Sequence, residues 1–184
     1  MGQIRSPRPV LSILAAFSRY DQALDWAQQT TAEEWGPIAL ASERFAFDQT
    51  TYYERTMGSD LRKVFFAFET LVQPAELVRR KRRANQWEEL YRDQHAHLES
   101  RPLNLDPGYV SEAKLILAST KDRDHRIYLS DGIYAEGTLF FHAGRWQTRP
   151  WTYPDYHCDG YHHFFERCRA YLRKRYSEDR DSQD

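Results

Sequence analysis

Apolar and polar positions along the chain follow two periods, one typical of strands and one typical of helices. Residues 10–17 form a continuous apolar run, which predicts a central, buried strand. Apolar side chains then recur at helical spacing from Tyr20 to Ala27 and again from Leu77 to Tyr91. Residues 38–40 and then 44–47 are predicted strand material that counts as one strand, and residues 64–68 and 101–105 predict two further strands. The resulting order, β-α-β-β-α-β, is the ferredoxin-like split βαβ pattern.

In the second half of the chain, the spacing of the apolar residues changes again. Asp106-Pro107-Gly108 predicts the start of a helix, whose narrow apolar face would hold Tyr109, Ala113, Ile116 and Leu117. Residues 126–130, 133–142 and 145–148 predict an antiparallel β-meander, and residues 160–175 predict a C-terminal helix. The predicted fold is therefore α+β: a ferredoxin-like βαββαβ core extended by a helix, an antiparallel β-meander and a C-terminal helix.

Composition narrows the class of protein. The 184 residues suit one domain, in which residues 1–9 are expected to form a flexible arm and residues 177–184 a flexible tail. Aromatic residues make up 15% of the chain, which predicts a core rich in aromatic rings.

A formal net charge of −1 gives no general attraction to nucleic acid or membrane surfaces. The two cysteines do not suggest a disulfide framework, so a cytoplasmic location is expected. The sequence does not indicate the oligomeric state.

Four ordered motifs carry a family resemblance. They are LNLDPGY at 103–109, TKD at 120–122 with HRIYL at 125–129, DGIYAE at 131–136, and PWTYPDY at 150–156. Residues 45–53 and the Met57-Gly58 pair fit the same pattern. Together they resemble a bacterial family named domain of unknown function 4416, and the resemblance covers nearly the whole chain. It implies no particular activity.

The hairpin centred on Asp131-Gly132 is the first candidate site. Asp-Gly is a strong signal for a two-residue type I′ turn, and that turn fixes which residues pair across the strands. The predicted pairs are Ser130 with Ile133, Leu129 with Tyr134, and Ile127 with Glu136. This register places Glu136 on an apolar-looking face, diagonal to His125. The two side chains are candidates for general acid–base catalysis, and the alternative is a structural ion pair that fixes the hairpin.

Other polar and aromatic residues are candidates for ligand binding. Lys121, Asp122 and Arg126 cluster around the approach to the hairpin, where Lys and Arg can hold a phosphate or a carboxylate. Asp106 most simply caps the predicted helix, or it marks a site for a metal or a hydroxyl group. The loops at Tyr52-Tyr53-Glu54 and residues 151–156 carry rings that either stack on a planar ligand or clamp a loop. The candidates in these loops are Tyr53, Trp151, Tyr153 and Asp155.

No metal site is predicted outright. The carboxylates that can be considered for Mg²⁺ are Asp106, Asp122, Asp131 and Glu136. Zinc is not favoured, because neither the pair His95 and His97 nor the group Cys158, His162, His163 and Cys168 has a recognised zinc spacing.

Two functional hypotheses follow. The first is a site for a phosphorylated or nucleotide-like small molecule, with Glu136 or His125 as the general base if the protein is an enzyme. The second is a non-catalytic RNA- or protein-binding module that uses the basic helix face from Arg79 to Arg83 and the aromatic loops. The sequence contains neither a G-x-x-x-x-G-K-[ST] phosphate loop nor a G-x-S-x-G nucleophile motif.

Overall fold

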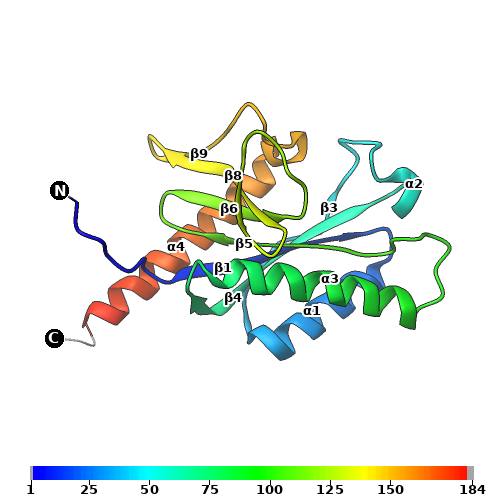
Figure 1. Ribbon diagram of the computed structural model, residues 1–184, viewed down its shortest axis with the longest axis horizontal. Helices are drawn as coiled ribbons and strands as arrows, with labels where there is room; N and C mark the ends of the chain where they lie inside the picture. The colour runs from blue at the N-terminus through cyan, green and yellow to red at the C-terminus, as the bar shows by residue number, and fades with distance from the viewer. Residues whose placement is uncertain (1, 182–184) are drawn as a thin grey trace.

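The computed structural model of the protein describes residues 2–181 and contains one continuous sheet with helices on both faces (Figure 1). The strands are β1 (Val10–Ser18), β2 (Ile38–Ala41), β3 (Phe45–Ala46), β4 (Arg62–Val72), β5 (Asn104–Val110), β6 (Lys114–Ser119), β7 (Arg126–Ser130), β8 (Ile133–His142) and β9 (Arg145–Thr148). The helices are α1 (Asp21–Trp35), α2 (Glu54–Met57), α3 (Glu76–Gln94) and α4 (Asp159–Asp181), with the 3-10 turn η1 (Pro154–His157) just before α4.

The sheet is antiparallel throughout. Its order is β2-β4-β1-β5-β6-β8-β7, with β3 also paired to β4 and β9 paired to β8. All residues of β1 are buried, which confirms the central strand predicted at residues 10–17. The predicted mixture of helices with an antiparallel sheet is also confirmed.

Each face of the sheet has its own core. On one face, α1 and α3 lie side by side and pack Leu24 and Trp87 against Leu14 and Phe66 of the strands (Figure 1). On the other face, α4 packs an aromatic cluster around Phe65 of β4. The rings nearest to Phe65 are those of Tyr161 at 4.6 Å, Phe165 at 5.1 Å and Phe164 at 5.6 Å between centroids. The expected aromatic core is therefore present, and it is concentrated under α4.

The helix predicted after Asp106-Pro107-Gly108 is absent, and that prediction was wrong. These three residues lie inside β5, where they pair with β1. The apolar residues that suggested a helical face belong to two strands and a turn: Tyr109 lies in β5, Ala113 in the turn, and Ile116 and Leu117 in β6. Pairing with the buried strand β1 overrides the local helix signal.

A split between β5 and β6 explains how Pro107 fits inside β5. The two strands pair only at residues 108–110 of β5, so the earlier half of β5 has no neighbour on that side. Side chains of α3 fill the gap: Glu88 accepts the Leu105 N–H at 2.7 Å, and Lys81 donates to the Leu105 C=O at 2.8 Å. Pro107, two residues further on, faces the same way and has no N–H to satisfy.

The same split brings Lys81 to a carboxylate. Its ammonium lies 2.9 Å from Oδ1 of Asp106, and only 5% of the Lys81 side chain is exposed. Burial by itself would raise the pKa of Asp106, but the charges of Lys81 and Arg101 lower it below its usual value. The pKa of Glu88 is raised by burial, against the opposing charges of Lys81 and Arg101. Asp106 is therefore a strand residue held by an ion pair, and the predicted role as a helix cap is wrong.

At the C-terminal end, the structure differs from the expected flexible tail. Residues 2–9 have no regular secondary structure, whereas α4 continues past its predicted end and includes residues 177–181. Residue 1 and residues 182–184 of the predicted arm and tail lie outside the described residues. In the part of the chain that the structure describes, no helix is both long enough and apolar enough to cross a membrane.

Gly108→Ala is expected to lower the free energy of unfolding by about 1–3 kcal/mol. The added Cβ would clash with β6, and β5 and β6 cannot move apart without losing their pairing. A Cβ at this position would lie 2.3 Å from the Ile116 carbonyl oxygen and 2.8 Å from Cδ2 of Leu117. Gly137→Ala is the matched control, since a Cβ there meets nothing closer than 4.0 Å. Urea unfolding measures both variants, and equal stabilities for Gly108→Ala and wild type would contradict the close approach of β5 and β6.

Asp106→Asn is expected to lower the free energy of unfolding by about 1–2 kcal/mol near pH 7, a modest value because 32% of the Asp106 side chain is exposed. Since folding lowers the Asp106 pKa, the ion pair contributes fully above the unfolded-state pKa of about 4. The contribution is lost as the pH falls through the lowered pKa. The gap between variant and wild type should therefore narrow as the pH falls below about 4, as measured by urea unfolding. A gap that does not narrow with falling pH, or an equal effect from the exposed pair variant Asp93→Asn, would contradict this.

Candidate functional site

A cavity of about 410 Å³ lies on the sheet face that α4 covers, next to η1. Its floor consists of side chains from four adjacent strands: Lys63 on β4, Phe17 on β1, Asp106 on β5 and Leu117 on β6. Residues from the segments 47–53, 121–126 and 151–156 form its walls. The cavity thus joins a rigid sheet to three connecting segments, an arrangement common in ligand sites.

Aromatic rings dominate the walls. They belong to Phe17, Phe47, Tyr52, Tyr53, Trp151, Tyr153 and Tyr156. Tyr52, Trp151 and Tyr153 are also partly exposed, by 67%, 41% and 43% respectively, so they present ring surface at the mouth. Tyr53 is half-buried against Phe17, and burial raises the pKa of its hydroxyl. The structure thus brings together the aromatic candidates from two distant loops.

A second cavity of about 110 Å³ opens at the split between β5 and β6. It shares Asp106, Lys121 and Arg126 with the larger cavity and adds Arg101 and Glu136. Its lining is mostly polar and charged, in contrast to the aromatic walls of the larger cavity. The two cavities therefore adjoin, with Lys121 and Arg126 at the boundary.

The hairpin has the predicted turn but not the predicted register. Asp131 and Gly132 both have positive φ, at 51° and 75°, as a type I′ turn requires. Leu129 is an extra residue, because Ser130 pairs with Ile133 while Tyr128 pairs with Tyr134. This bulge shifts every later pair by one residue, so the predicted pairing of Glu136 with Ile127 was wrong. Glu136 instead pairs with Arg126 and shares its face.

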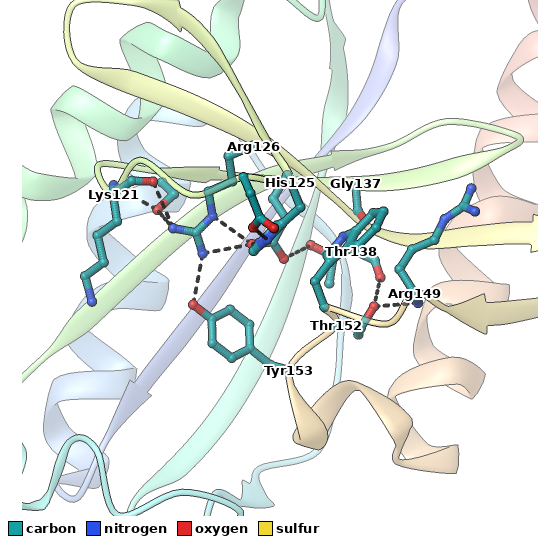
Figure 2. A network of polar contacts seen from close by, with 12 residues as sticks. Lys121, His125, Arg126, Gly137, Thr138, Arg149, Thr152 and Tyr153 are labelled. Atoms are coloured by element: carbon teal, nitrogen blue, oxygen red, sulfur yellow. Dashed lines mark hydrogen bonds and ion pairs between the residues drawn. The ribbon is translucent and has the colours of Figure 1, made fainter.

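Glu136 lies at the centre of a polar network, most of which Figure 2 shows. The carboxylate is 2% exposed, and its Oε2 accepts from Nε and Nη2 of Arg126 at 2.9 and 2.8 Å. The same oxygen lies 3.2 Å from Nε2 of His125, and Oε1 accepts from the Thr138 hydroxyl at 3.1 Å. The predicted contact between Glu136 and His125 is present, but the guanidinium of Arg126 is the closer partner.

Arg126 connects this carboxylate to the walls of the cavity (Figure 2). Its Nη1 donates to the Ser119 hydroxyl at 2.8 Å and to the Lys121 carbonyl at 3.0 Å. Its Nη2 donates to the Tyr153 hydroxyl at 2.9 Å. Burial would lower the pKa of Arg126, but Glu136 raises it above its usual value. The guanidinium therefore holds three segments together and has little donor capacity left for a ligand.

His125 lies flat against Trp151, with ring centroids 5.5 Å apart and planes at 11°. Both of its ring nitrogens lie near carboxylates: Nε2 near Glu136, and Nδ1 at 3.1 Å from Asp124. The Asp124 side chain is 99% exposed, so this second contact is easily exchanged for water or a ligand. Trp151 is held in turn by a hydrogen bond of 3.1 Å from Nε1 to the Gly137 carbonyl.

Two cations at the cavity have no carboxylate partner in the described part of the chain. Lys121 donates to the Tyr52 hydroxyl at 2.9 Å, and this hydrogen bond lowers the pKa of Tyr52. Arg123 lines the cavity, and no carboxylate of residues 2–181 lies within ion-pair distance of it. These side chains contrast with Arg126, whose charge is already balanced by Glu136.

Sequence reasoning missed two charged residues of the cavity, Arg123 and Lys63. Lys63 lies one position before the predicted strand at residues 64–68, and its side chain forms a buried ion pair with Asp155 of η1. The sequence signal was a single lysine at the edge of an apolar run, which is ordinarily an exposed strand end. The predicted ligand residue Asp155 is therefore at the site, but its charge is balanced by Lys63.

The remaining candidates lie apart. Asp122 does not line either cavity. Three of the four carboxylates considered for Mg²⁺ contact cations: Asp106 binds Lys81, Asp131 lies 3.6 Å from Arg82, and Glu136 binds Arg126. Within residues 2–181, no group of three or more His, Cys, Asp or Glu side chains is arranged to hold a metal ion.

The basic run from Arg79 to Arg83 has two buried members, Arg80 and Lys81, and three at the surface, Arg79, Arg82 and Arg83. Arg80 is 4% exposed and lies over the Trp35 ring, and burial lowers its pKa to about 10. Lys81 reaches through the sheet to Asp106, as described above. The other side chains face carboxylates: Arg79 binds Glu76, Arg82 lies near Asp131, and Arg83 binds Glu34.

Comparison with known proteins identifies the family but no activity. No curated protein and no solved structure matches this chain. One family model matches residues 8–171, which include every strand, both cavities and most of α4. The chain belongs to the family described as Domain of unknown function (DUF4416).

Proposed function

We propose that the larger cavity binds a small, anionic, ring-bearing molecule, either a phosphorylated metabolite or a nucleotide. The observation that carries this proposal is the pair of cations Lys121 and Arg123, which lack carboxylate partners in the described residues and stand at an aromatic cavity. A phosphate between them would gain charge-assisted hydrogen bonds. Rings such as Trp151 and Tyr153 would stack on the planar part, a contact worth about 1–3 kcal/mol per base.

The smaller cavity supports the same assignment. Its lining carries four cationic side chains, Lys81, Arg101, Lys121 and Arg126, against two carboxylates, Asp106 and Glu136, so positive charge remains near the boundary between the cavities. Its volume of about 110 Å³ suits a compact group rather than a ring. We therefore assign the polar group of the ligand to this boundary and the ring to the larger cavity.

If the protein is an enzyme, His125 is the proton-transfer group that a ligand reaches. It lines the larger cavity, and a ligand can displace the exposed Asp124 from Nδ1. Glu136 lines only the smaller cavity, and its carboxylate is held by His125, Arg126 and Thr138. Its role in the proposal is to orient His125 and Arg126, with His125 as the general base.

The fold supports a finer assignment as well. The six elements β1, α1, β2, β4, α3 and β5 follow the β-α-β-β-α-β order, and their strands lie in the order β2-β4-β1-β5. We propose that they form a ferredoxin-like core to which β6–β9 and α4 are added. A cytoplasmic location is proposed on the two free thiols, Cys158 and Cys168. The RNA-binding alternative is not favoured, because Arg80 and Lys81 of the basic run are buried and the other three side chains each face a carboxylate.

Ligand binding is tested by thermal-shift screening against nucleoside monophosphates and phosphorylated aromatic metabolites. A ligand at a hundredfold its dissociation constant should stabilise the protein by about 2.7 kcal/mol. The double variant Lys121→Gln/Arg123→Gln should bind the best ligand about 10–100-fold more weakly, since it loses both uncompensated charges. Lys114→Gln/Arg145→Gln removes the same charge from exposed positions away from the cavity and should bind as wild type does. Equal affinities for the two double variants would contradict the proposed anion site.

The positioning role of Glu136 is tested by stability. Glu136→Gln should lower the free energy of unfolding by about 3–5 kcal/mol, because it leaves the Arg126 guanidinium buried without a carboxylate. The double variant Arg126→Met/Glu136→Leu should recover part of this loss by removing both charges. Glu112→Gln, which breaks an exposed pair, should change stability by less than about 1 kcal/mol. If Glu136→Gln behaved like Glu112→Gln in urea unfolding, the network would not be organised around Glu136.

A further inference from the structure

A buried ion pair forms one end of the larger cavity and is not used by the proposed anion site. Lys63 on β4 and Asp155 on η1 are each 5% exposed, and both line the cavity. Removing two charges from water is costly, and a buried ion pair often gives less stability than packed apolar side chains of the same volume. A pair of this kind at the floor of a pocket is therefore a candidate for chemistry.

The surroundings of the Lys63 ammonium are aromatic. Nζ lies 3.9 Å from the centroid of Phe47, 5.1 Å from that of Phe17 and 5.2 Å from that of Tyr156. Burial, reinforced by the charge of Asp155, raises the pKa of the Tyr156 hydroxyl well above its usual value, so this phenol remains neutral. Asp155 is then the anionic group that contacts Nζ. The end of the cavity is lined by aromatic rings and holds one amine and one carboxylate.

Lys81 provides an internal comparison, since it is as deeply buried as Lys63. Its ammonium makes two hydrogen bonds, to the Leu105 carbonyl and to Asp106, and both close the split between β5 and β6. Within residues 2–181, Asp155 is the only hydrogen-bonding partner of the Lys63 ammonium. Lys81 thus has a structural task that accounts for its burial, whereas the Lys63 ammonium lies among rings and lines the cavity.

We propose that Lys63 is a carbonyl-capturing amine, which forms an imine with an aldehyde or ketone group of the bound molecule. This inference rests on the proposed function, because the same cavity holds the ring and the anionic group. It narrows the ligand to planar, anionic carbonyl compounds. Buried lysines in apolar pockets are suited to such chemistry, and exclusion of water protects the imine from hydrolysis.

The step is balanced with the groups present. The Lys63 ammonium gives a proton to Asp155, and the freed amine attacks the carbonyl carbon, forming a C–N bond as the C=O π electrons move to oxygen. After proton transfer from nitrogen to oxygen, Asp155 returns its proton to the resulting hydroxyl. The C–O bond breaks, water leaves, and the nitrogen lone pair forms the C=N bond. One ammonium and one carbonyl thus give one protonated imine and one water, with no change in oxidation state and with Asp155 regenerated.

The experiment traps the imine by reduction. Wild-type protein is incubated with pyridoxal 5′-phosphate, a planar phosphorylated aldehyde, then treated with borohydride, digested and mapped by mass spectrometry. The expected result is a reduced adduct on Lys63 in most molecules, with none on the equally buried Lys81. Adducts on Lys121 or on exposed lysines such as Lys114, with none on Lys63, would overturn the proposal.

A matched compound separates this proposal from the binding proposal. Pyridoxine 5′-phosphate has the same ring and phosphate but an alcohol in place of the aldehyde. If it stabilises the protein in a thermal shift while pyridoxal 5′-phosphate leaves Lys63 unlabelled, the cavity binds the ring and phosphate and the imine proposal is overturned. If labelling of Lys63 occurs, excess pyridoxine 5′-phosphate should suppress it.

A variant tests the carboxylate. Asp155→Asn should slow the labelling of Lys63 at least about tenfold, because the amide cannot accept the ammonium proton. Labelling at the wild-type rate would show that Asp155 has no part in the step. Lys63→Met is a weaker test by itself, since it leaves the Asp155 carboxylate buried without a partner and can unfold the protein. The mass-spectrometric map of labelled lysines in the wild-type protein does not depend on either variant.

Discussion

A buried charge needs a partner, and at the cavity three ion pairs meet this constraint. Three cations with side chains less than about a tenth exposed each face a carboxylate from another element: Lys63 with Asp155, Arg126 with Glu136, and Lys81, which enters from α3 on the opposite face, with Asp106. The pairs of Lys63 and Lys81 join parts of the chain that are distant in sequence, and the pair of Arg126 joins the two strands of the hairpin. Together they fix the floor and walls of the larger cavity before any ligand arrives. The pairs define the shape of the site more than they add stability, because desolvation offsets much of their attraction.

Once these pairs are formed, the positive charge that remains at the cavity lies at its mouth, next to exposed aromatic rings. Lys121 and Arg123 retain positive charge at the mouth, while Trp151 and Tyr153 offer ring surface beside them. Arg126 does not act on a ligand directly in this arrangement, since its donors already hold Glu136 and two loops. Pre-formed sites of this kind bind without ordering a loop first, which reduces the entropic cost of association.

Local patterns predicted the elements better than the contacts between them. The apolar run of β1 and the Asp131-Gly132 turn were readable because each depends on neighbouring residues only. The approach of Glu136 to His125 also followed from the turn, although the bulge at Leu129 shifted the register and replaced an apolar neighbour with Arg126. The strand through Pro107 and the roles of Lys63 and Lys81 could not be predicted. They arise because β1 recruits β5 as a partner, and because α3 and η1 bring charges from remote parts of the sequence.

The central claim is that the larger cavity recognises an anionic group beside a ring. Isothermal titration calorimetry on the wild-type protein, with matched pairs of a nucleoside 5′-monophosphate and its nucleoside, measures this directly. The account predicts that at least one monophosphate binds, that its nucleoside binds at least about tenfold more weakly, and that added salt reduces the difference. A nucleoside that binds as tightly as its monophosphate, or a complete absence of binding across all pairs, would contradict it.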